Sequence, residues 1–181
     1  LMKYEITGHS SNIGKTIYDR LTSQGIECLG FSRSNGYDIS DPDARARIIA
    51  ESADCDVFIN NARSKFSQSE LLLEYFLAHR TLPKVIVNVG SVIAEDTMEL
   101  PIKWSDDYFY INMMYKVALK NLCKRLNDQC ALESNRDIAK IQIKYVWFGW
   151  VDTDFLRQNY PQRAHTAITC DEAADKILAC V

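Results

Sequence analysis

The sequence predicts a single α/β domain with a Rossmann-like, doubly wound parallel sheet of five or six strands. Short apolar segments alternate with longer amphipathic segments along all 181 residues, at the spacing that right-handed β-α-β crossovers need. A glycine-containing turn joins the first apolar segment to the first amphipathic one, as in nucleotide-binding folds. Because no internal repeat or linker interrupts this alternation, we expect residues 1–181 to form one domain.

In the first half of the chain, strand and helix patterns alternate. Ile13, Ile17 and Leu21 recur at a spacing of four, which places them on one face of a helix. Asp41 is a favourable helix N-cap, and Pro42 suits the first turn that follows it. We expect strands at residues 3–7, 26–31, 57–59 and 85–87, and helices after residues 12, 41 and 68.

In the second half, a long amphipathic segment at residues 106–128 predicts a helix. Its expected buried face consists of Ile111, Tyr115, Ala118, Leu119, Leu122 and Leu126. Residues 141–147 alternate and then become fully apolar, which is typical of a strand buried at one end. Thr169 and Glu172 have the spacing of a capping box, so a last helix is expected to begin after Thr169.

The composition excludes several classes of protein. Lys and Arg number 21 against 24 Asp and Glu, and 47% of residues are apolar, which argues against disorder and against a basic nucleic-acid binder. The six cysteines show neither a C-x-x-C pair nor zinc-ligand spacing, so no metal site is expected. No apolar stretch approaches the length of a membrane span. We therefore expect a cytoplasmic protein with no nucleic-acid or membrane partner.

The turn at residues 7–14 has the composition of a phosphate-binding loop. Glycines let the backbone approach a pyrophosphate, whose charge is attracted by free N–H groups and by the positive end of the helix dipole. Asn12 stands where glycine is usual, and asparagine tolerates positive φ. The alternative is a plain strand-to-helix turn that binds no ligand. The residues predicted to hold a dinucleotide here are Gly8, His9, Ser10, Ser11, Asn12, Ile13 and Gly14.

Together with five later segments, this turn resembles the short-chain dehydrogenase/reductase family. The segments follow the family's order over about 150 residues: Asp38-Ile39, Asn60-Asn61-Ala62, Val87-Asn88-Val89-Gly90-Ser91, Lys116-Val117-Ala118-Leu119 and Gly149-x-Val151-x-Thr153. The resemblance implies an NAD(P)-dependent oxidoreductase that transfers hydride between nicotinamide and a carbonyl or alcohol. Arg63 and Phe148 depart from the pattern, since the family usually has glycine and proline at these positions.

Cofactor contacts beyond the first turn are implied by this resemblance. They comprise Asp38 and Ile39 at the adenine, Asn61 and Ala62 along the adenosine ribose, and Gly149, Val151 and Thr153 at the nicotinamide carboxamide. The end of the second expected strand carries Ser32 and Arg33 and no carboxylate. A basic residue there pairs with the 2′-phosphate of NADP, whereas NAD requires an acidic one. NADP is therefore favoured over NAD, unless Arg33 is only a solvated loop residue.

The catalytic set implied by the resemblance is incomplete. Ser91 matches the serine that hydrogen-bonds the carbonyl oxygen, and Lys116 matches the lysine that binds the nicotinamide ribose. The family's tyrosine, four residues before that lysine, is replaced by Asn112, which cannot act as a general acid. Three tyrosines precede Lys116 at other spacings: Tyr108, Tyr110 and Tyr115. Tyr108 is the best substitute, and Tyr110 or a water molecule held by Asn112 are further alternatives.

Three hypotheses about function remain open. The first is a weakly active NADP-dependent reductase of a small carbonyl compound. The second is a non-catalytic dinucleotide-binding sensor or interaction module. The third is a fold with an empty pocket, closed by Arg63 or Phe148. Met113, Met114 and Tyr115 on the long helix are candidates for a homodimer or homotetramer contact, with packing against the sheet as the alternative.

Overall fold

The protein folds around one parallel sheet of five strands in the order β2-β1-β3-β4-β5. The computed structural model describes residues 2–95, 107–133 and 140–181, except the side chains of 107–109 and 133. The strands are β1 (Tyr4–Thr7), β2 (Cys28–Phe31), β3 (Val57–Asn60), β4 (Val85–Val89) and β5 (Gln142–Val146). The strand order reverses beside β1, as in doubly wound folds, so the predicted fold class is confirmed.

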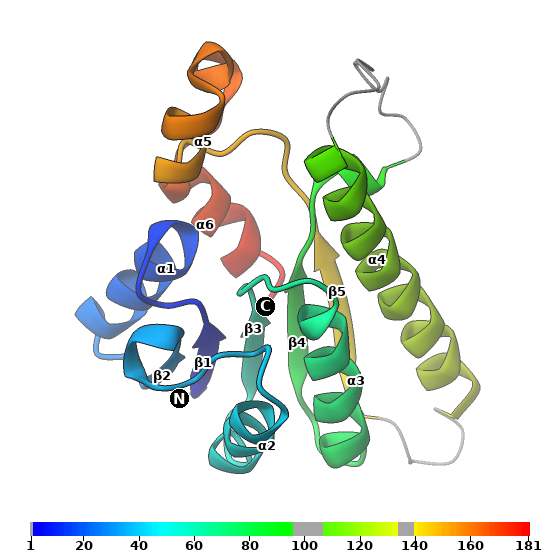
Figure 1. Ribbon diagram of the computed structural model, residues 1–181. Helices are drawn as coiled ribbons and strands as arrows, with labels where there is room; N and C mark the ends of the chain where they lie inside the picture. The colour runs from blue at the N-terminus through cyan, green and yellow to red at the C-terminus, as the bar shows by residue number, and fades with distance from the viewer. Residues whose placement is uncertain (1, 96–106, 134–139) are drawn as a thin grey trace.

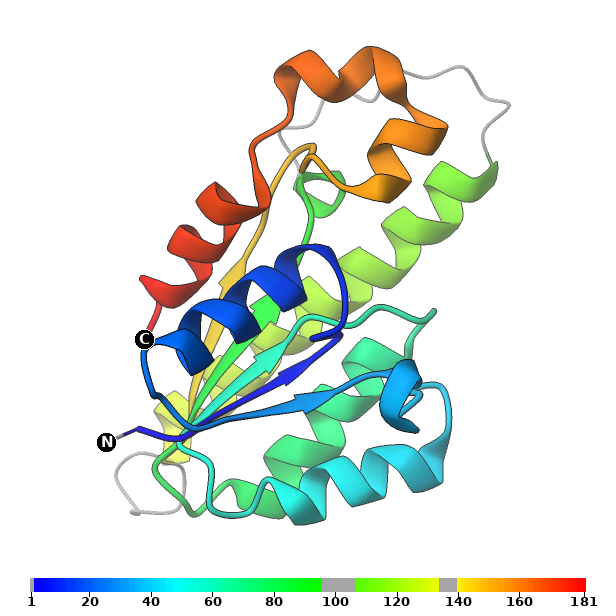
Figure 2. The same cartoon turned by 90° about the vertical axis from the view of Figure 1, so that its left-hand side faces the viewer.

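Helices cover both faces of the sheet (Figures 1 and 2). They are α1 (Asn12–Ser23), α2 (Pro42–Glu51), α3 (Ser67–His79), α4 (Asp107–Glu133), α5 (Asp154–Asn159) and α6 (Cys170–Leu178), with short 3-10 turns η1 (Arg33–Asn35), η2 (Val92–Ala94) and η4 (Pro161–Thr166). Helices α1 and α6 share one face, and α2, α3 and α4 share the other. This arrangement is the layering that alternating strands and helices predict.

Two apolar cores lie on opposite sides of the sheet because neighbouring strand residues point to opposite faces. In β3, Phe58 packs with the α2, α3 and α4 side chains, whereas Val57 and Ile59 pack with α1 and α6. All three are fully buried. Burial on both faces explains why the strand segments of the sequence are continuously apolar rather than alternating.

The predicted helix starts are confirmed by the capping contacts. Asp41 accepts a hydrogen bond from the backbone N–H of Asp43 at 3.0 Å. Thr169 and Glu172 form a reciprocal capping box at the start of α6. One prediction for the long helix is wrong: Ile111 is 46% exposed. Ile111 belongs to the first turns of α4, and these turns extend past the ends of the strands (Figure 1).

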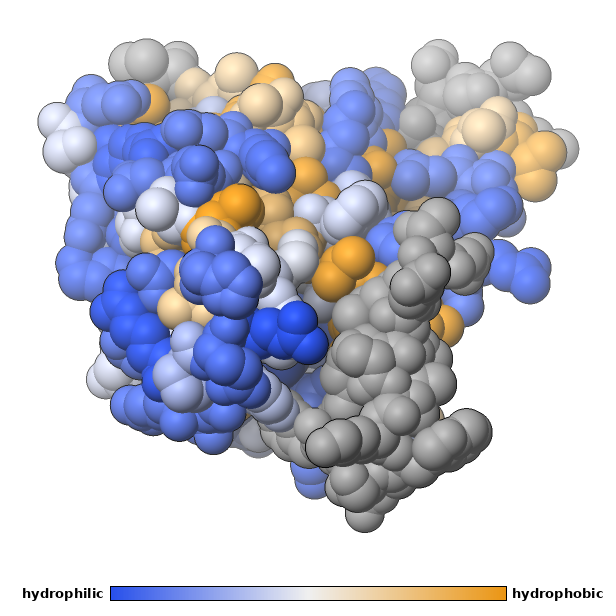
Figure 3. Space-filling view, turned by 90° about the horizontal axis from the view of Figure 1, so that it is seen from above, coloured by the Kyte–Doolittle hydropathy of each residue, from blue (hydrophilic) through white to orange (hydrophobic). Residues whose placement is uncertain are grey.

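The carboxyl ends of all five strands meet at one edge of the molecule (Figure 1). Seen from this edge, the surface is mainly hydrophilic, with apolar residues exposed between the hydrophilic ones (Figure 3). Ligands of open α/β sheets bind at this edge, where the strand order reverses. Across the described ranges, no helix combines the length and apolar character that crossing a bilayer would need.

Candidate functional site

The β1–α1 turn has the backbone geometry that its sequence predicts. Gly8 has φ +76° and Asn12 has φ +47°, so the expectation that Asn12 tolerates a left-handed conformation is confirmed. A Cβ atom on Gly14 would lie 2.1 Å from the Gly8 carbonyl oxygen, so this position excludes any side chain. Ser11 precedes α1 without a side-chain capping bond. The first N–H groups of any α-helix have no acceptor within their own helix, and in α1 the Ser11 side chain does not supply one.

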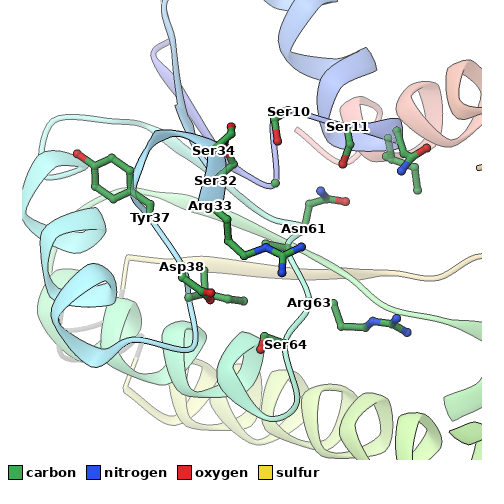
Figure 4. A pocket seen from close by; sticks show the side chains of 15 residues that line it. Ser10, Ser11, Ser32, Arg33, Ser34, Tyr37, Asp38, Asn61, Arg63 and Ser64 are labelled. Carbon is green, nitrogen blue, oxygen red and sulfur yellow. Dashed lines mark hydrogen bonds between the residues drawn. The ribbon is translucent and has the colours of Figure 1, made fainter. Parts of the chain in front are cut away.

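A cavity of about 810 Å³ lies beside this turn, and we call it the first cavity (Figure 4). It is bounded by the β1–α1 turn, the segment after β2 and the segment after β3. The lining residues are Gly8, Ser10, Ser11, Asn12, Ile13, Ser32, Arg33, Ser34, Tyr37, Asp38, Ile39, Asn61, Ala62, Arg63 and Ser64. Figure 4 shows the Arg33 side chain extending from η1 toward the side of the cavity where Asn61 lies.

Most of the residues that were predicted to contact the dinucleotide outside the nicotinamide region come together in the first cavity. His9 and Gly14 do not line it. The His9 ring packs against α1 and β2 instead: it lies 4.9 Å from the Tyr18 ring, and a Cβ on Gly30 would lie 2.4 Å from it. His9 and Gly14 therefore support the conformation of the turn without lining the cavity. Gly30 leaves room for the His9 imidazole because it has no side chain.

The charge in the first cavity is positive. Arg33 and Arg63 supply two guanidinium groups, against the single carboxylate of Asp38. Two groups of Ser40 donate hydrogen bonds to Asp38 Oδ1: the backbone N–H at 2.9 Å and the hydroxyl at 2.8 Å. These bonds, with a smaller effect of Arg33, hold the pKa of Asp38 below its usual value. Positive charge beside free helix amides is the environment that phosphate groups prefer.

A second cavity of about 140 Å³ adjoins the first, and Arg63 lines both. Its lining residues are Arg63, Ser91, Val92, Ile93, Asn112, Lys116, Gly149, Trp150, Phe155 and Tyr160. Ser91, Asn112, Lys116 and Gly149 are therefore neighbours, although they come from four different segments of the chain. This grouping is the one that the family resemblance implied for the nicotinamide end of the site.

Lys116 is buried at the wall of the second cavity. Its ammonium donates to Gln68 Oε1 at 2.8 Å and to the Val89 carbonyl at 2.9 Å. Burial, with a smaller repulsion from Arg63, lowers the pKa of Lys116 to about 7. The side chain is thus held rigidly by α3 and β4, and its charge is sensitive to pH in the neutral range.

The tyrosines of α4 do not provide a proton donor among the described side chains. Tyr110 and Tyr115 do not line the second cavity, and the Tyr115 ring packs edge-on against Phe66 at 4.7 Å. The side chain of Tyr108, the substitute favoured from the sequence, lies outside the described residues. Among the described residues that line this cavity, Tyr160 is the only one with a phenol group.

Residues after β5 take several different places. Val151 pairs with Ile168, and Thr153 accepts a hydrogen bond from the Leu156 N–H at 3.3 Å. Neither residue is among the described residues that line the first or the second cavity. Phe148 is buried in the core between the sheet and α6. It therefore does not close the site, which was one of the two alternatives in the hypothesis of a pocket closed by Arg63 or Phe148; Arg63 lines both cavities.

The sequence did not predict the aromatic wall of the second cavity. Of the three tryptophans, Trp150 lines the cavity, Trp147 is 46% exposed and Trp104 lies outside the described residues. Phe155 and Tyr160 were not identified as candidates. The only sequence signal was the density of aromatic residues between positions 147 and 160.

Comparisons with solved structures define the class of fold. No protein-family model matches the chain, and no curated protein matches its sequence. A 3-alpha-hydroxysteroid dehydrogenase from Pseudomonas sp. B-0831, complexed with NADH, superposes with a TM-score of 0.74 at 18% identity, covering 97% of this chain and 87% of that chain. A short chain dehydrogenase from Burkholderia cenocepacia J2315, in complex with NADP, gives 0.74 at 16% identity over 98% and 83%.

A third match is a short-chain dehydrogenase from Sphingobium yanoikuyae in complex with NADPH, with a TM-score of 0.67 at 18% identity over 99% of this chain and 84% of that chain. At identities this low, the superpositions show a common fold and nothing more specific. The protein therefore has the Rossmann-like fold of the short-chain dehydrogenases, with the strand order β2-β1-β3-β4-β5. Its structural similarity to NAD(P)-dependent oxidoreductases of that type is distant.

Proposed function

We propose that this protein is an NADP(H)-dependent oxidoreductase that reduces a small carbonyl compound or oxidises the corresponding alcohol. The observation that carries the proposal is that Arg63 lines both cavities, so the two sets of polar groups lie on either side of one side chain. One end offers free helix amides and cationic side chains, and the other offers Ser91 and Lys116. Solved structures with this fold hold NADH, NADP or NADPH, which supports the choice of ligand.

In the proposed complex, the pyrophosphate lies against the first-turn amides of α1 and the hydroxyls of Ser10 and Ser11. Asp38 and Ile39 bound the adenine, and Asn61 and Ala62 follow the adenosine ribose. The 2′-phosphate lies beside Ser32 and Arg33, where a guanidinium can pair with it. His9 and Gly14 act indirectly, because they shape the turn rather than line the cavity.

The nicotinamide end extends toward the second cavity. When bound, the cofactor supplies the hydride. Ser91 donates a hydrogen bond to the carbonyl oxygen of the substrate, and Lys116, held by Gln68 and Val89, provides positive charge beside the ribose. Asn112 orients a water molecule but does not release a proton itself. Loss of a positioned general acid costs about 10²–10⁴ in rate, so slow turnover is expected.

Cofactor titration tests the binding part of the proposal. We expect NADPH to bind more tightly than NADH, and Arg33→Glu to weaken NADPH binding by about tenfold or more because the 2′-phosphate would face a carboxylate. NADH binding should change by less than about threefold. Arg125→Glu, on the exposed surface of α4 and outside both cavities, is the matched control. No binding of either nucleotide at millimolar concentration would refute the proposal.

Turnover tests the catalytic part. NADPH oxidation over a panel of small aldehydes and ketones should be slow in the unaltered protein and at least about tenfold slower in Ser91→Ala, which loses the donor to the carbonyl oxygen. If the unaltered protein and Ser91→Ala consume NADPH at the same background rate, the enzyme hypothesis fails.

A second candidate function is a non-catalytic dinucleotide-binding module. Two observations favour it: Asn112 occupies the place of the ionisable tyrosine, and the Lys116 ammonium is bonded to Gln68 and Val89 within the protein. Such a module binds NADP(H) with the Arg33 dependence described above but shows no Ser91-dependent turnover. The two assays together distinguish the two functions.

A further inference from the structure

The wall of the second cavity is aromatic on the side formed by the chain after β5. The Trp150 and Tyr160 rings have centroids 5.3 Å apart, and those of Phe155 and Tyr160 are 6.1 Å apart. Val92 and Ile93 of η2 add apolar surface across the cavity. Rings at these separations form a rigid surface that favours a flat, apolar ligand.

The charge in the same cavity is cationic. Arg63 and Lys116 line it, and no Asp or Glu does so among the residues that the structure describes. The Arg63 guanidinium lies 5.9 Å from the centroid of the Phe155 ring, so a cation and an aromatic ring are combined at one place. Arg63 also contributes to the lowered pKa of Lys116, so the two basic side chains are close enough to act on one ligand.

The donor groups suit a carboxylate. A guanidinium can bind both oxygens of a carboxylate through parallel N–H bonds. The Lys116 ammonium has three N–H groups, of which two are committed to Gln68 Oε1 and the Val89 carbonyl. Ser91 supplies a hydroxyl at a separate point of the lining, where a carbonyl oxygen can be received.

We infer that the second cavity is a subsite for a small aromatic carboxylate whose aldehyde or keto group is presented to Ser91. Arg63 binds the carboxylate, and Trp150 and Phe155 contact the ring. The inference rests on the proposed function for its reaction but not for binding, because the acid is recognised by this chain's own side chains. It specifies the class of substrate that the second cavity accepts.

A binding experiment tests this inference without turnover. Isothermal titration of the purified full chain with 4-formylbenzoate and with its methyl ester, in the absence of NADPH, compares an anion with a neutral ligand that carries the same ring. We expect the acid to bind about tenfold or more tightly than the ester. Arg63→Gln should abolish this preference and leave ester binding within about twofold.

Two further variants complete the design. Arg163→Gln removes an exposed arginine of η4 that lines neither cavity, so it should retain the full preference for the acid. Phe155→Ala removes part of the aromatic wall and should weaken acid and ester alike, by about fivefold or more. Circular dichroism verifies that each variant is folded.

The outcomes separate the two proposals. Equal affinity for acid and ester, or an unchanged preference in Arg63→Gln, overturns the inference. So does a loss of NADPH binding in Arg63→Gln with acid binding intact, since Arg63 would then serve the cofactor phosphates. Tight, Arg63-dependent binding of the acid by a protein that binds no NADPH would support the carboxylate subsite and refute the proposed function.

Discussion

At the scale of single residues, Asn112 most limits the chemistry of the site. It lines the second cavity with Ser91 and Lys116, one helical turn before the lysine. We expect Asn112→Tyr to raise the rate of NADPH-dependent carbonyl reduction by about tenfold or more, because a phenol near an ammonium can donate the proton that an amide cannot. Initial rates of NADPH oxidation with 4-formylbenzoate measure this gain.

Asn112→Phe is the matched control for the phenol. It has nearly the same size as tyrosine but no hydroxyl, so a gain that also appears in this variant would arise from packing rather than from acid catalysis. If the reduction rate of Asn112→Tyr does not increase although NADPH binds and the fold is intact, the prediction is wrong. The side chain at position 112 is then too far from the reacting carbonyl to donate a proton.

Lys116 gives a second residue-scale prediction, for stability against pH. Its pKa falls from 10.5 to about 7 on folding, so between those values the unfolded chain binds the extra proton. The free energy of unfolding therefore rises with pH over this window, and Lys116 contributes at most about 1.4 kcal/mol per pH unit to this rise. The free energy of unfolding decreases again as the pH is lowered toward 7. Urea denaturation between pH 7 and 10 in the unaltered protein and in Lys116→Met measures the difference.

The comparison with Lys116→Met is necessary because other groups titrate in the same range. Burial raises the pKa values of the Cys28, Cys55 and Cys123 thiols to about 12, and these groups act in the opposite direction above their unfolded pKa. They are present in both proteins and cancel in the difference.

At the scale of elements, the β1–α1 turn depends on the left-handed conformation of Asn12. We expect Asn12→Ala to lower the unfolding free energy by about 1 kcal/mol, since alanine has neither the short polar side chain nor the freedom that φ +47° requires. Asn12→Gly should retain full stability because glycine adopts this conformation without strain. Denaturant midpoints measure both variants, and equal stability of Asn12→Ala would contradict the strain argument.

The elements themselves were largely predictable from the sequence, and the reason is local. Ile17 and Leu21 have helical spacing and both are buried on the same face of α1. Asp41 caps the next helix by accepting a hydrogen bond from Asp43, only two residues further along the chain. The phosphate-binding end of the site was predictable for the same reason, since the turn between β1 and α1 is a continuous segment. Ile111 was wrongly expected to be buried, because periodicity does not tell where a helix leaves the sheet.

The catalytic end was harder to predict because its contacts join distant parts of the chain. Lys116 is held by Gln68, 48 residues away, and no pattern around either residue indicates this bond. Phe155 lies in a helix of six residues, too short for a periodic signal. Arg63 was visible only as a departure from glycine, and no local pattern indicates that it lines two cavities whose other residues come from distant segments.

At the scale of the whole molecule, the two cavities lie at the edge where the parallel strands end. The outer surfaces of α3 and α4 lie outside this edge and are available for other contacts. These helices pack side by side (Figure 1). Both expose apolar side chains at helical spacing: Leu73 and Leu77 on α3, and Ile111 and Met114 on α4, with exposures between 39% and 55%. Exposed apolar residues on neighbouring helices favour a protein–protein interface.

We expect two copies of the chain to pair through this surface. The double variant Leu77→Glu, Met114→Glu should shift the protein from dimer to monomer, because each interface would bury charges of the same sign. Light scattering coupled to size-exclusion chromatography at micromolar concentration measures the mass. Met2→Glu changes an exposed apolar residue that precedes β1 and belongs to neither helix, so it should leave the dimer intact. A monomeric unaltered protein would contradict the pairing, whereas both cavities, which are lined by one chain, would remain complete.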